Sequence, residues 1–238
     1  MAAKGGGVFK AMVRRGKADT DMILAPPRPG IYVRGTETVD QILKAALDVL
    51  IDEGADAFTL RRIAARCDMK VGNVSYHFPR KEMLIQVMLD DLVDSYGAAL
   101  DQTVRKPGLT AEERLKRIIL LCLDDIQTKR TTHLFTELWA LANHSEFVAD
   151  RVRAFYQRVH GAIGEYVAQL NPALSPDDVH SVALFISASM EGSTPFLGHN
   201  KPWADKMPAF TALAATSFIH LAKTVTSRDI AGLVAEPA

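Results

Sequence analysis

Apolar residues recur every three to four positions along most of the chain, which is the spacing of one buried helix face. The first such segment starts near residue 36, where Thr38 and Gln41 have the spacing of a capping box, and Gly54 stands where the helix is expected to stop. We therefore predict a first helix over about residues 36–53. Its apolar face consists of Val39, Ile42, Leu43, Ala46, Leu47 and Leu50.

Two much shorter helices are predicted next. Thr59 is a good N-cap for the first of them, with Ile63 and Ala64 facing inward. The pattern breaks at Asp68, resumes over about residues 70–76 and is ended by Pro79. Asp tolerates the left-handed backbone that a tight turn needs better than most residues other than glycine. The segment therefore predicts two short helices joined by a tight turn.

The remainder of the chain continues the helical pattern. Ser175 followed by Pro176 is a clear restart signal, since serine caps a helix and proline suits its first position. No segment alternates as a strand does, so the fold class is all-α with about nine helices. We expect a polar tail after the last helix. The six later helices are predicted near residues 83–96, 115–126, 134–142, 148–170, 176–190 and 210–225.

Residues 1–35 do not share this pattern. They contain Gly5-Gly6-Gly7, the segment Pro26-Pro27-Arg28-Pro29-Gly30 and scattered basic residues. We expect a flexible basic arm, whose functional role or origin from an upstream start site the sequence leaves open.

The charge of the chain is zero only by cancellation. The 238 residues carry 28 Lys or Arg and 28 Asp or Glu, but residues 1–82 hold 14 basic against 10 acidic residues. The remainder holds 14 basic against 18 acidic residues. This asymmetry is typical of a chain of which one part meets a polyanion, although a difference of this size also arises by chance.

Several other functional classes lack their signals. Two cysteines, Cys67 and Cys122, make neither a disulfide framework nor a cysteine metal cluster, and no signal peptide or membrane span is recognisable, so we expect a cytoplasmic protein. His133 and Glu137 lie one helical turn apart, but two ligands do not make a metal site. No cofactor or metal is expected. The sequence has no nucleophile elbow and no phosphate loop.

Chemistry suited to DNA gathers around the two short helices. A short helix held by such a turn can enter the major groove, which is wide enough to admit it. The stretch from Lys70 to Lys81 is dense in hydrogen-bond donors and cations, which suit contacts to phosphates and bases. These residues are Lys70, Asn73, Ser75, Tyr76, His77, Arg80 and Lys81.

Residues 59–82 resemble the helix-turn-helix of the tetracycline-repressor (TetR) family. Thr59-Leu60-Arg61-Arg62-Ile63-Ala64 matches the start of that motif, and Gly72 followed by Tyr76-His77-Phe78 and Lys81 matches its end. The turn departs from the family pattern, with Cys67-Asp68-Met69-Lys70 in place of the usual Ala-Gly-Val-Ser. Asn73 and Ser75 also replace the usual phosphate ligands, which puts the bases that are read in doubt.

The resemblance implies a DNA-binding domain over residues 36–96 with its helix-turn-helix at 59–78. Three of these residues have plain alternatives to a DNA contact. Lys70 could be an ordinary solvated side chain. The Tyr76 ring could pack on the first helix, and His77 could make a structural hydrogen bond. The residues expected at DNA are Thr59, Arg61, Lys70, Val71, Asn73, Ser75, Tyr76, His77 and Lys81.

The resemblance also implies that residues 97–238 bind a small-molecule effector and form the dimer. The helix at 176–190 carries small residues that suit close helix approach at an interface but are also common in cores: Ala183, Ser187, Ala188 and Ser189. Candidate effector contacts are polar or aromatic groups at otherwise apolar positions. They are His133, Trp139, Asn143, His144, Tyr156, His160, Met190 and Glu191.

The function expected from these observations is a sequence-specific transcriptional regulator. We expect a homodimer that represses from a palindromic DNA operator and is released by an unidentified effector, without a membrane partner. The helix beginning near residue 83 connects the two domains and is the expected lever between them. The alternative is an all-α enzyme or small-molecule carrier, which leaves the match at residues 59–81 unexplained.

Overall fold

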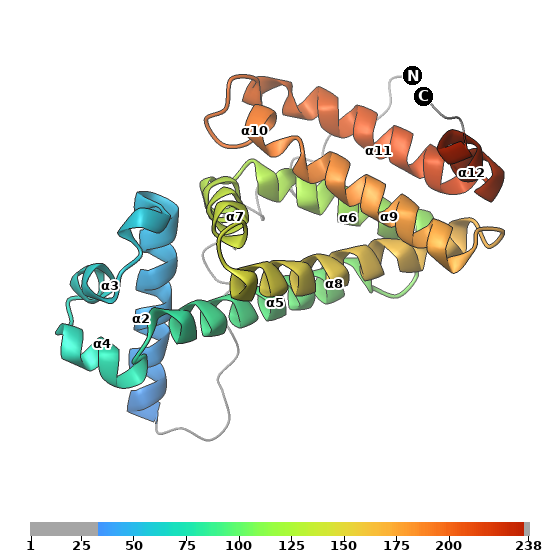
Figure 1. The fold of residues 1–238 in the computed structure, drawn as a ribbon. Helices are drawn as coiled ribbons and strands as arrows, with labels where there is room; N and C mark the ends of the chain where they lie inside the picture. The colour runs from blue at the N-terminus through green and yellow to red at the C-terminus, as the bar shows by residue number, and fades with distance from the viewer. Residues whose placement is uncertain (1–32, 236–238) are drawn as a thin grey trace.

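The computed structural model describes residues 33–235, with side chains from residue 37 to 232. Within that range every regular element is helical, which confirms the all-α class. Each of the nine predicted helices has a counterpart, and Figure 1 shows how they are arranged. The predicted arm falls mostly on residues 1–32, outside the described residues.

The first described helix, α2, spans Val33–Glu53 and therefore starts earlier than predicted. Thr38 and Gln41 lie inside it, so the predicted capping box is wrong and the last residues of the predicted arm are helical. The end of α2 was predicted correctly, because Gly54 follows it with φ of 84°, a left-handed conformation that suits glycine. A short 3₁₀ helix, η1, follows at Ala55–Ala57.

Helices α3 (Leu60–Arg66) and α4 (Val71–His77) are the two short helices that the sequence predicts. The next four helices begin earlier than their apolar patterns, and in three of them a polar cap marks the start. Thr110 makes a full capping box with Glu113, and Thr128 and Ser145 each accept a hydrogen bond from the backbone three residues later. The four helices are α5 (Lys81–Val104), α6 (Ala111–Ile126), α7 (Lys129–Ala142) and α8 (Glu146–Leu170).

Helix α9 spans Pro176–Glu191 and is capped by Ser175 as predicted. The one-turn helix α10 (Thr194–Leu197) and the 3₁₀ helix η2 (Ala204–Lys206) lead to α11 (Met207–Thr224). The predicted polar tail is wrong, because Ser227–Ala235 forms a further helix, α12. The Asp229 carboxylate accepts hydrogen bonds from the backbone N–H and the hydroxyl of Thr226, which stabilises the start of this helix.

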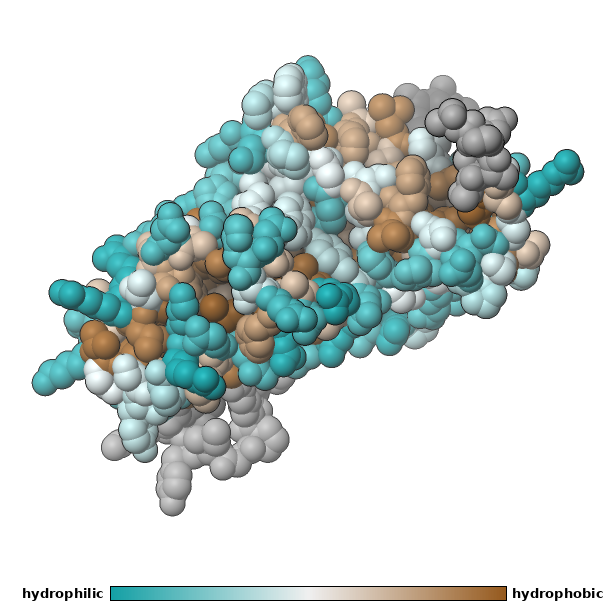
Figure 2. Space-filling model, in the orientation of Figure 1, coloured by the Kyte–Doolittle hydropathy of each residue, from teal (hydrophilic) through white to brown (hydrophobic). Residues whose placement is uncertain are grey.

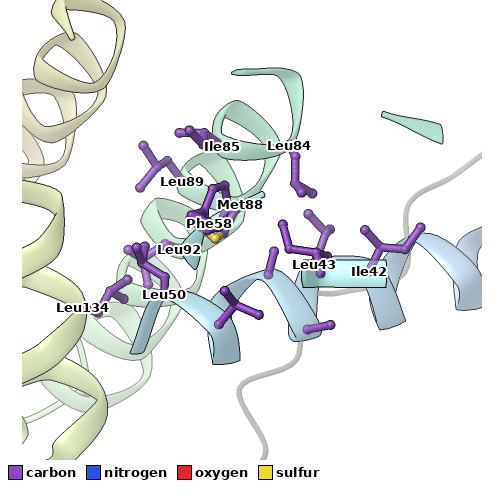
Figure 3. Close-up of a cluster of buried hydrophobic side chains, with 14 of the residues drawn as sticks. Ile42, Leu43, Leu50, Phe58, Leu84, Ile85, Met88, Leu89, Leu92 and Leu134 are labelled. Atoms are coloured by element: carbon purple, nitrogen blue, oxygen red, sulfur yellow. The ribbon is translucent and has the colours of Figure 1, made fainter. Parts of the chain in front are cut away.

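The buried apolar residues form two clusters. The first joins α2, α3, α4 and the first part of α5, and it extends into α7 and α8 through Leu134, Phe135 and Phe155. Figure 3 shows Leu134 of α7 reaching the same cluster as Leu50 of α2. The second cluster joins the end of α5 with α6, the second half of α8, α9 and α11. The helices nearest the N-terminus thus share their core with α7 and α8.

Figure 1 shows α2, α3 and α4 grouped at one end of the molecule, with α5 leading away from them. Helix α5 packs beside α8, α8 packs against α9, and α11 packs against α6. Helix α7 stands between α2 and this larger group and contacts α2 and α8. The small group of helices is therefore supported by α5 along the chain and by α7 across it.

Two valines of α4 test how the short helices are held. Val74 is fully buried, whereas Val71 is 43% exposed. We expect Val74→Ala to lower the free energy of unfolding by about 2 kcal/mol, because it removes buried methyl groups and leaves a cavity. Val71→Ala is the matched control and should change it by less than about 0.5 kcal/mol. Urea denaturation measures both, and equal effects of the two variants would contradict the packing described for α4.

Candidate nucleic-acid interface and interior polar cluster

The turn between α3 and α4 is built as the sequence predicts. The Thr59 side chain accepts a hydrogen bond of 3.1 Å from the backbone N–H of Arg62 and so caps α3. Asp68 has φ of 52°, which is the left-handed conformation expected at the break. The Met69 N–H then donates to the Ala64 carbonyl over 2.9 Å, which closes the turn. Helix α4 therefore leaves α3 abruptly instead of continuing it.

Helix α3 packs against α2, helix α4 packs against α3, and each short helix buries one face in the first apolar cluster. Ile63 and Ala64 of α3 and Val74 of α4 are buried, and Phe58 and Phe78 lie before α3 and after α4 in the same cluster. Because these apolar side chains take up the inner face, the polar residues of α4 point outward. The orientation of α4 thus follows from the position of its few apolar residues.

The outer face of α4 and the start of α5 form a continuous exposed polar stretch. Tyr76 is 81% exposed, so its ring does not pack on the first helix, which was the plain alternative for this residue. Its ring instead meets that of His77 edge to face, with centroids 5.2 Å apart. Ser75 and His77 are half-buried, and Gly72 has open space around it. The exposed members are Lys70, Val71, Asn73, Tyr76, Arg80 and Lys81.

Ion pairs decide which cations of α3 remain exposed and unpaired. Arg62 pairs with Glu53 at 2.5 Å, and Arg66 pairs with Asp52 at 2.6 Å. The hydrogen bond from Arg62 lowers the pKa of Glu53, so this carboxylate stays ionised. Among the described residues, Arg61 forms no such ion pair and is exposed. The sequence does not predict the ion pairs of Arg62 and Arg66, because their partners come from the end of α2.

A second group of polar residues lies inside the larger helical group. The Trp139 indole N–H donates to the Tyr156 hydroxyl over 3.0 Å, and the Tyr156 ring stacks on His160 at 6.1 Å between centroids. Burial raises the pKa of Tyr156, so its hydroxyl keeps its proton. Three of the predicted effector contacts thus lie together.

Two carboxylates complete this interior polar cluster, which we define as Tyr96, Asp125, Trp139, Tyr156 and Glu191. Asp125 accepts hydrogen bonds from the Tyr96 hydroxyl at 2.6 Å and from Thr131 at 2.7 Å. Burial, together with the charge of Asp125, raises the pKa of Glu191 to about 7. Sequence reasoning missed Tyr96 and Asp125. Tyr96 falls at the helical spacing of an apolar face, and Asp125 stands beside Asp124, as solvated acidic pairs do.

The other predicted effector contacts lie elsewhere. Met190 is a buried member of the second apolar cluster, and Asn143 and His144 are exposed just after the end of α7. The Nδ1 atom of His133 lies 2.9 Å from the Ile51 carbonyl oxygen of α2, so this residue meets the N-terminal helices. Among the described residues, no group of three or more His, Cys, Asp or Glu side chains is placed to hold a metal ion.

A third surface is apolar and exposed. Leu184 and Phe185 of α9 and Leu213 of α11 are largely exposed, and Leu213 reaches 69%. Figure 2 shows hydrophobic residues over these C-terminal helices in the upper part of the view. An open groove of about 330 Å³ adjoins them, lined by Phe196, Leu197, Trp203 and Phe210 among others. Exposed apolar surface of this kind is typical of a protein interface.

Two family models match the chain, one over the N-terminal helices and one over the larger helical group. Residues 42–88 match the model of bacterial regulatory proteins of the tetR family, and residues 111–215 match the C-terminal model of BetI-type transcriptional repressors. Together the two matches cover more than half of the chain. The chain belongs to the TetR family.

Individual relatives of this TetR-family chain are distant. A helix-turn-helix regulator encoded 5′ of dhlA in Xanthobacter autotrophicus is 26% identical over 136 residues. That match spans 55% of this chain and 66% of the relative, slightly less than two thirds of its length.

Solved structures of low sequence identity share the fold. A transcriptional regulator from Rhodococcus sp. is 18% identical with a TM-score of 0.65, over 79% of this chain and 99% of that one. A regulator from Saccharomonospora viridis, solved in complex with choline, is 17% identical with a TM-score of 0.62, over 78% and 95% of the two chains. In the part of the chain that the structure describes, no helix combines the length and apolar character needed to cross a membrane.

Glu191 makes a pH-dependent contribution to stability that can be measured. Its pKa is raised from 4.5 to about 7 in the folded protein, so between these pH values the folded state holds more protons than the unfolded one. The free energy of unfolding should therefore fall as pH rises from about 4.5 to 7. Gln resembles the protonated carboxyl group, so Glu191→Gln should be more stable than the unmodified protein at pH 8, by about 1–3 kcal/mol, and equal to it near pH 4.5.

Urea denaturation of both proteins at the two pH values gives this difference. Glu146→Gln, at an exposed position of α8, is the matched control and should leave the pH dependence as it is. The same stability gain at pH 4.5 as at pH 8 would show that charge at residue 191 is not its cause.

Proposed function

We propose that this chain is a DNA-binding transcriptional regulator, acting in the cytoplasm as a ligand-responsive repressor. The observation that carries the proposal is the exposed polar face of α4, held outward by the turn at Asp68 and by the burial of Val74. A helix presented in this way fits the major groove, and the cations at Lys70, Arg80 and Lys81 suit the phosphates beside it. The alternative of an enzyme or carrier leaves this exposed face of α4 unexplained.

The contacts proposed at DNA divide into two kinds. Arg61, Lys70 and Lys81 are cations that suit phosphates, and Thr59 stands at the exposed start of α3. Asn73 and Tyr76 are exposed on α4, where base edges would lie, and the exposed Val71 would touch a thymine methyl group. Ser75 and His77 are half-buried, which suits contacts at the margin of the groove.

The proposed assembly is a homodimer formed through α9 and α11. Their exposed Leu184, Phe185 and Leu213 would be covered by the same residues of a second copy, since a two-fold axis brings identical surfaces together. Ala188 and Ser217 are exposed on the same two helices and are small enough to allow close approach. Ala183 and Ser187 are instead buried within the chain, which is the core alternative for these small residues. Two copies of α4 would then read a palindromic operator, with centres about 34 Å apart.

The function is tested by selecting fragments of the source genome on the purified protein. We expect recovery of a few palindromic fragments, bound by two chains for each site. Mass photometry of the complex gives this stoichiometry. Retention of no fragment at low salt would contradict DNA binding and support the enzyme or carrier alternative.

Lys81→Ala and Asn73→Ala should weaken DNA binding in different ways. Loss of a phosphate contact lowers the affinity for all sequences and reduces the slope of log K against log salt by about 1. Loss of a base contact instead changes the preference among operators, by about 1–3 kcal/mol at the base pair concerned. Fluorescence anisotropy on the selected operator and on single-base variants, at several salt concentrations, separates the two effects.

Lys116→Ala, on the exposed side of α6, is the control for a lysine far from α4 and should change neither quantity. An unchanged salt slope for Lys81→Ala would remove Lys81 from the phosphate contacts. A uniform loss of affinity for Asn73→Ala would remove Asn73 from base recognition.

We further propose that the effector binds at the interior polar cluster and is an organic cation. Glu191 and Asp125 put two carboxylates among the rings of Tyr96, Trp139 and Tyr156, and a cation between them would be attracted by both carboxylates and rings. The structural relative from Saccharomonospora viridis was solved with choline, which supports this ligand class for the fold. His160 stacks on Tyr156 and would border the same site.

Choline and its neutral isostere 3,3-dimethyl-1-butanol form a matched pair of probes for the proposed charge preference. We expect choline to bind measurably in isothermal titration calorimetry, and the isostere to bind at least about tenfold more weakly because it lacks the charge. Glu191→Gln should reduce the difference. Equal binding of choline and the isostere would contradict a site built for cations.

A further inference from the structure

The end of α2 is capped by side chains of another helix. Backbone groups at a helix end have no partner within the helix and need one from outside it. The Leu50 carbonyl is satisfied locally by Gly54 N–H, but the Ile51 carbonyl accepts a hydrogen bond from His133 Nδ1 of α7 at 2.9 Å. A residue 82 positions further along the chain therefore supplies this cap.

The segment after α2 receives a second cap from α7. Glu137 accepts a hydrogen bond of 2.9 Å from the backbone N–H of Ala55, the first residue of η1. Its carboxylate also lies 3.4 Å from where a side chain on Gly54 would begin. Glycine is thus favoured at position 54 both by its left-handed backbone and by the nearby Glu137 carboxylate. Helix α3 begins only a few residues later.

An ion pair extends the same contact. Lys129 Nζ lies 2.7 Å from Asp52 Oδ1, and this hydrogen bond is the largest cause of the lowered pKa of Asp52. Lys129, His133 and Glu137 are spaced four residues apart and so share one face of α7. We call these three residues and their partners in α2 and η1 the α7–α2 contact.

Helix α7 also carries residues of the interior polar cluster and its surroundings. Thr131 donates a hydrogen bond to Asp125, and Trp139 donates one to Tyr156. Phe135 lies between them in sequence and contacts the rings of Tyr96 and Tyr156. A shift of α7 caused at this cluster would therefore move Lys129, His133 and Glu137 with it.

We propose that Lys129, His133 and Glu137 are positioning residues for DNA recognition, which fix the angle between the α2–α4 group and the larger helical group. This inference rests on the proposed function, because the angle sets the distance between the two copies of α4 in a dimer. Helix α5 joins the groups along the chain and their apolar core continues into α7 and α8, but apolar contacts are not directional. The hydrogen bonds and ion pair of the α7–α2 contact add the directional constraint and make α7 a second path from the effector site to DNA.

Glu137→Ala tests the inference, with Glu113→Ala as its matched control. Both glutamates accept a backbone N–H at a helix start, Glu137 from Ala55 at 2.9 Å and Glu113 from Thr110 at 2.8 Å. Both variants should lose similar stability. Only Glu137→Ala should weaken operator binding, by about 5- to 20-fold, while binding to unrelated DNA at low salt stays unchanged. Glu137→Gln keeps an acceptor oxygen and should restore most of the operator affinity.

A distance measurement gives a readout that does not depend on DNA. Spin labels at Ala65→Cys on α3 and Ala154→Cys on α8, both exposed, report the angle between the two groups of helices in a Cys67→Ser, Cys122→Ala background. Glu137→Ala should broaden the distance distribution, and Glu113→Ala should not.

The outcomes separate this inference from the proposed function. If the unmodified protein binds no operator, the proposed function fails, and the distance distributions still test the contact. If it binds, and Glu137→Ala matches Glu113→Ala in both operator affinity and distance distribution, the positioning role is overturned. Loss of affinity that Glu137→Gln does not restore would also overturn it.

Discussion

The carboxyl end of α2 is the point on which the arrangement of this protein depends. Asp52 and Glu53 hold Arg66 and Arg62 of α3, which fixes the first of the two short helices. The same end is capped by His133 and receives Lys129 of α7, so one short segment meets both parts of the molecule. Individual exposed ion pairs contribute little, but these lie around a helix end whose backbone groups need partners. Their combined effect is to set orientation more than stability.

The acidic residues at the end of α2 pair with some cations of the N-terminal helices and leave others exposed. Arg62 and Arg66 are paired with acidic residues, whereas Lys70, Arg80 and Lys81 remain exposed near α4. The net charge of the N-terminal third therefore gives too small a measure of the positive charge near α4. Part of the acidic charge in this third of the chain is paired with arginines of α3. In the larger helical group the notable charges are instead inside, where Glu191 lies near Asp125. A protein of zero net charge can thus present cations at one end and bury carboxylates at the other.

The sequence predicted the helices well because burial follows an apolar period that can be read directly. Thr59, Asp68, Gly54 and Ser175 were read correctly as caps and turns, since their local chemistry acts within a few residues. The start of α2 and the helix α12 were missed, because the first extends before its apolar face and the second is held by Asp229 rather than by a long apolar stripe. The candidate DNA face was read from a specific motif within one short segment.

The interior could be predicted only in part. Trp139, Tyr156 and Glu191 were recognised as polar groups at apolar positions, but Asp125 and Tyr96 look like ordinary members of their helices. His133 was recognised as unusual, yet its partner is a backbone carbonyl of α2, which no side-chain pattern reveals. Contacts between segments far apart in sequence depend on how helices cross, and apolar periodicity says which face is buried without saying against what.

The proposed function requires two copies of α4, held at a fixed distance, to read one operator. It is tested most directly by moving the two halves of the selected operator apart by five base pairs, half a turn of DNA, which places them on opposite faces of the duplex. The affinity for this DNA should fall to that for unrelated DNA. Unchanged affinity, measured in the same buffer, would contradict paired reading by a dimer of defined geometry.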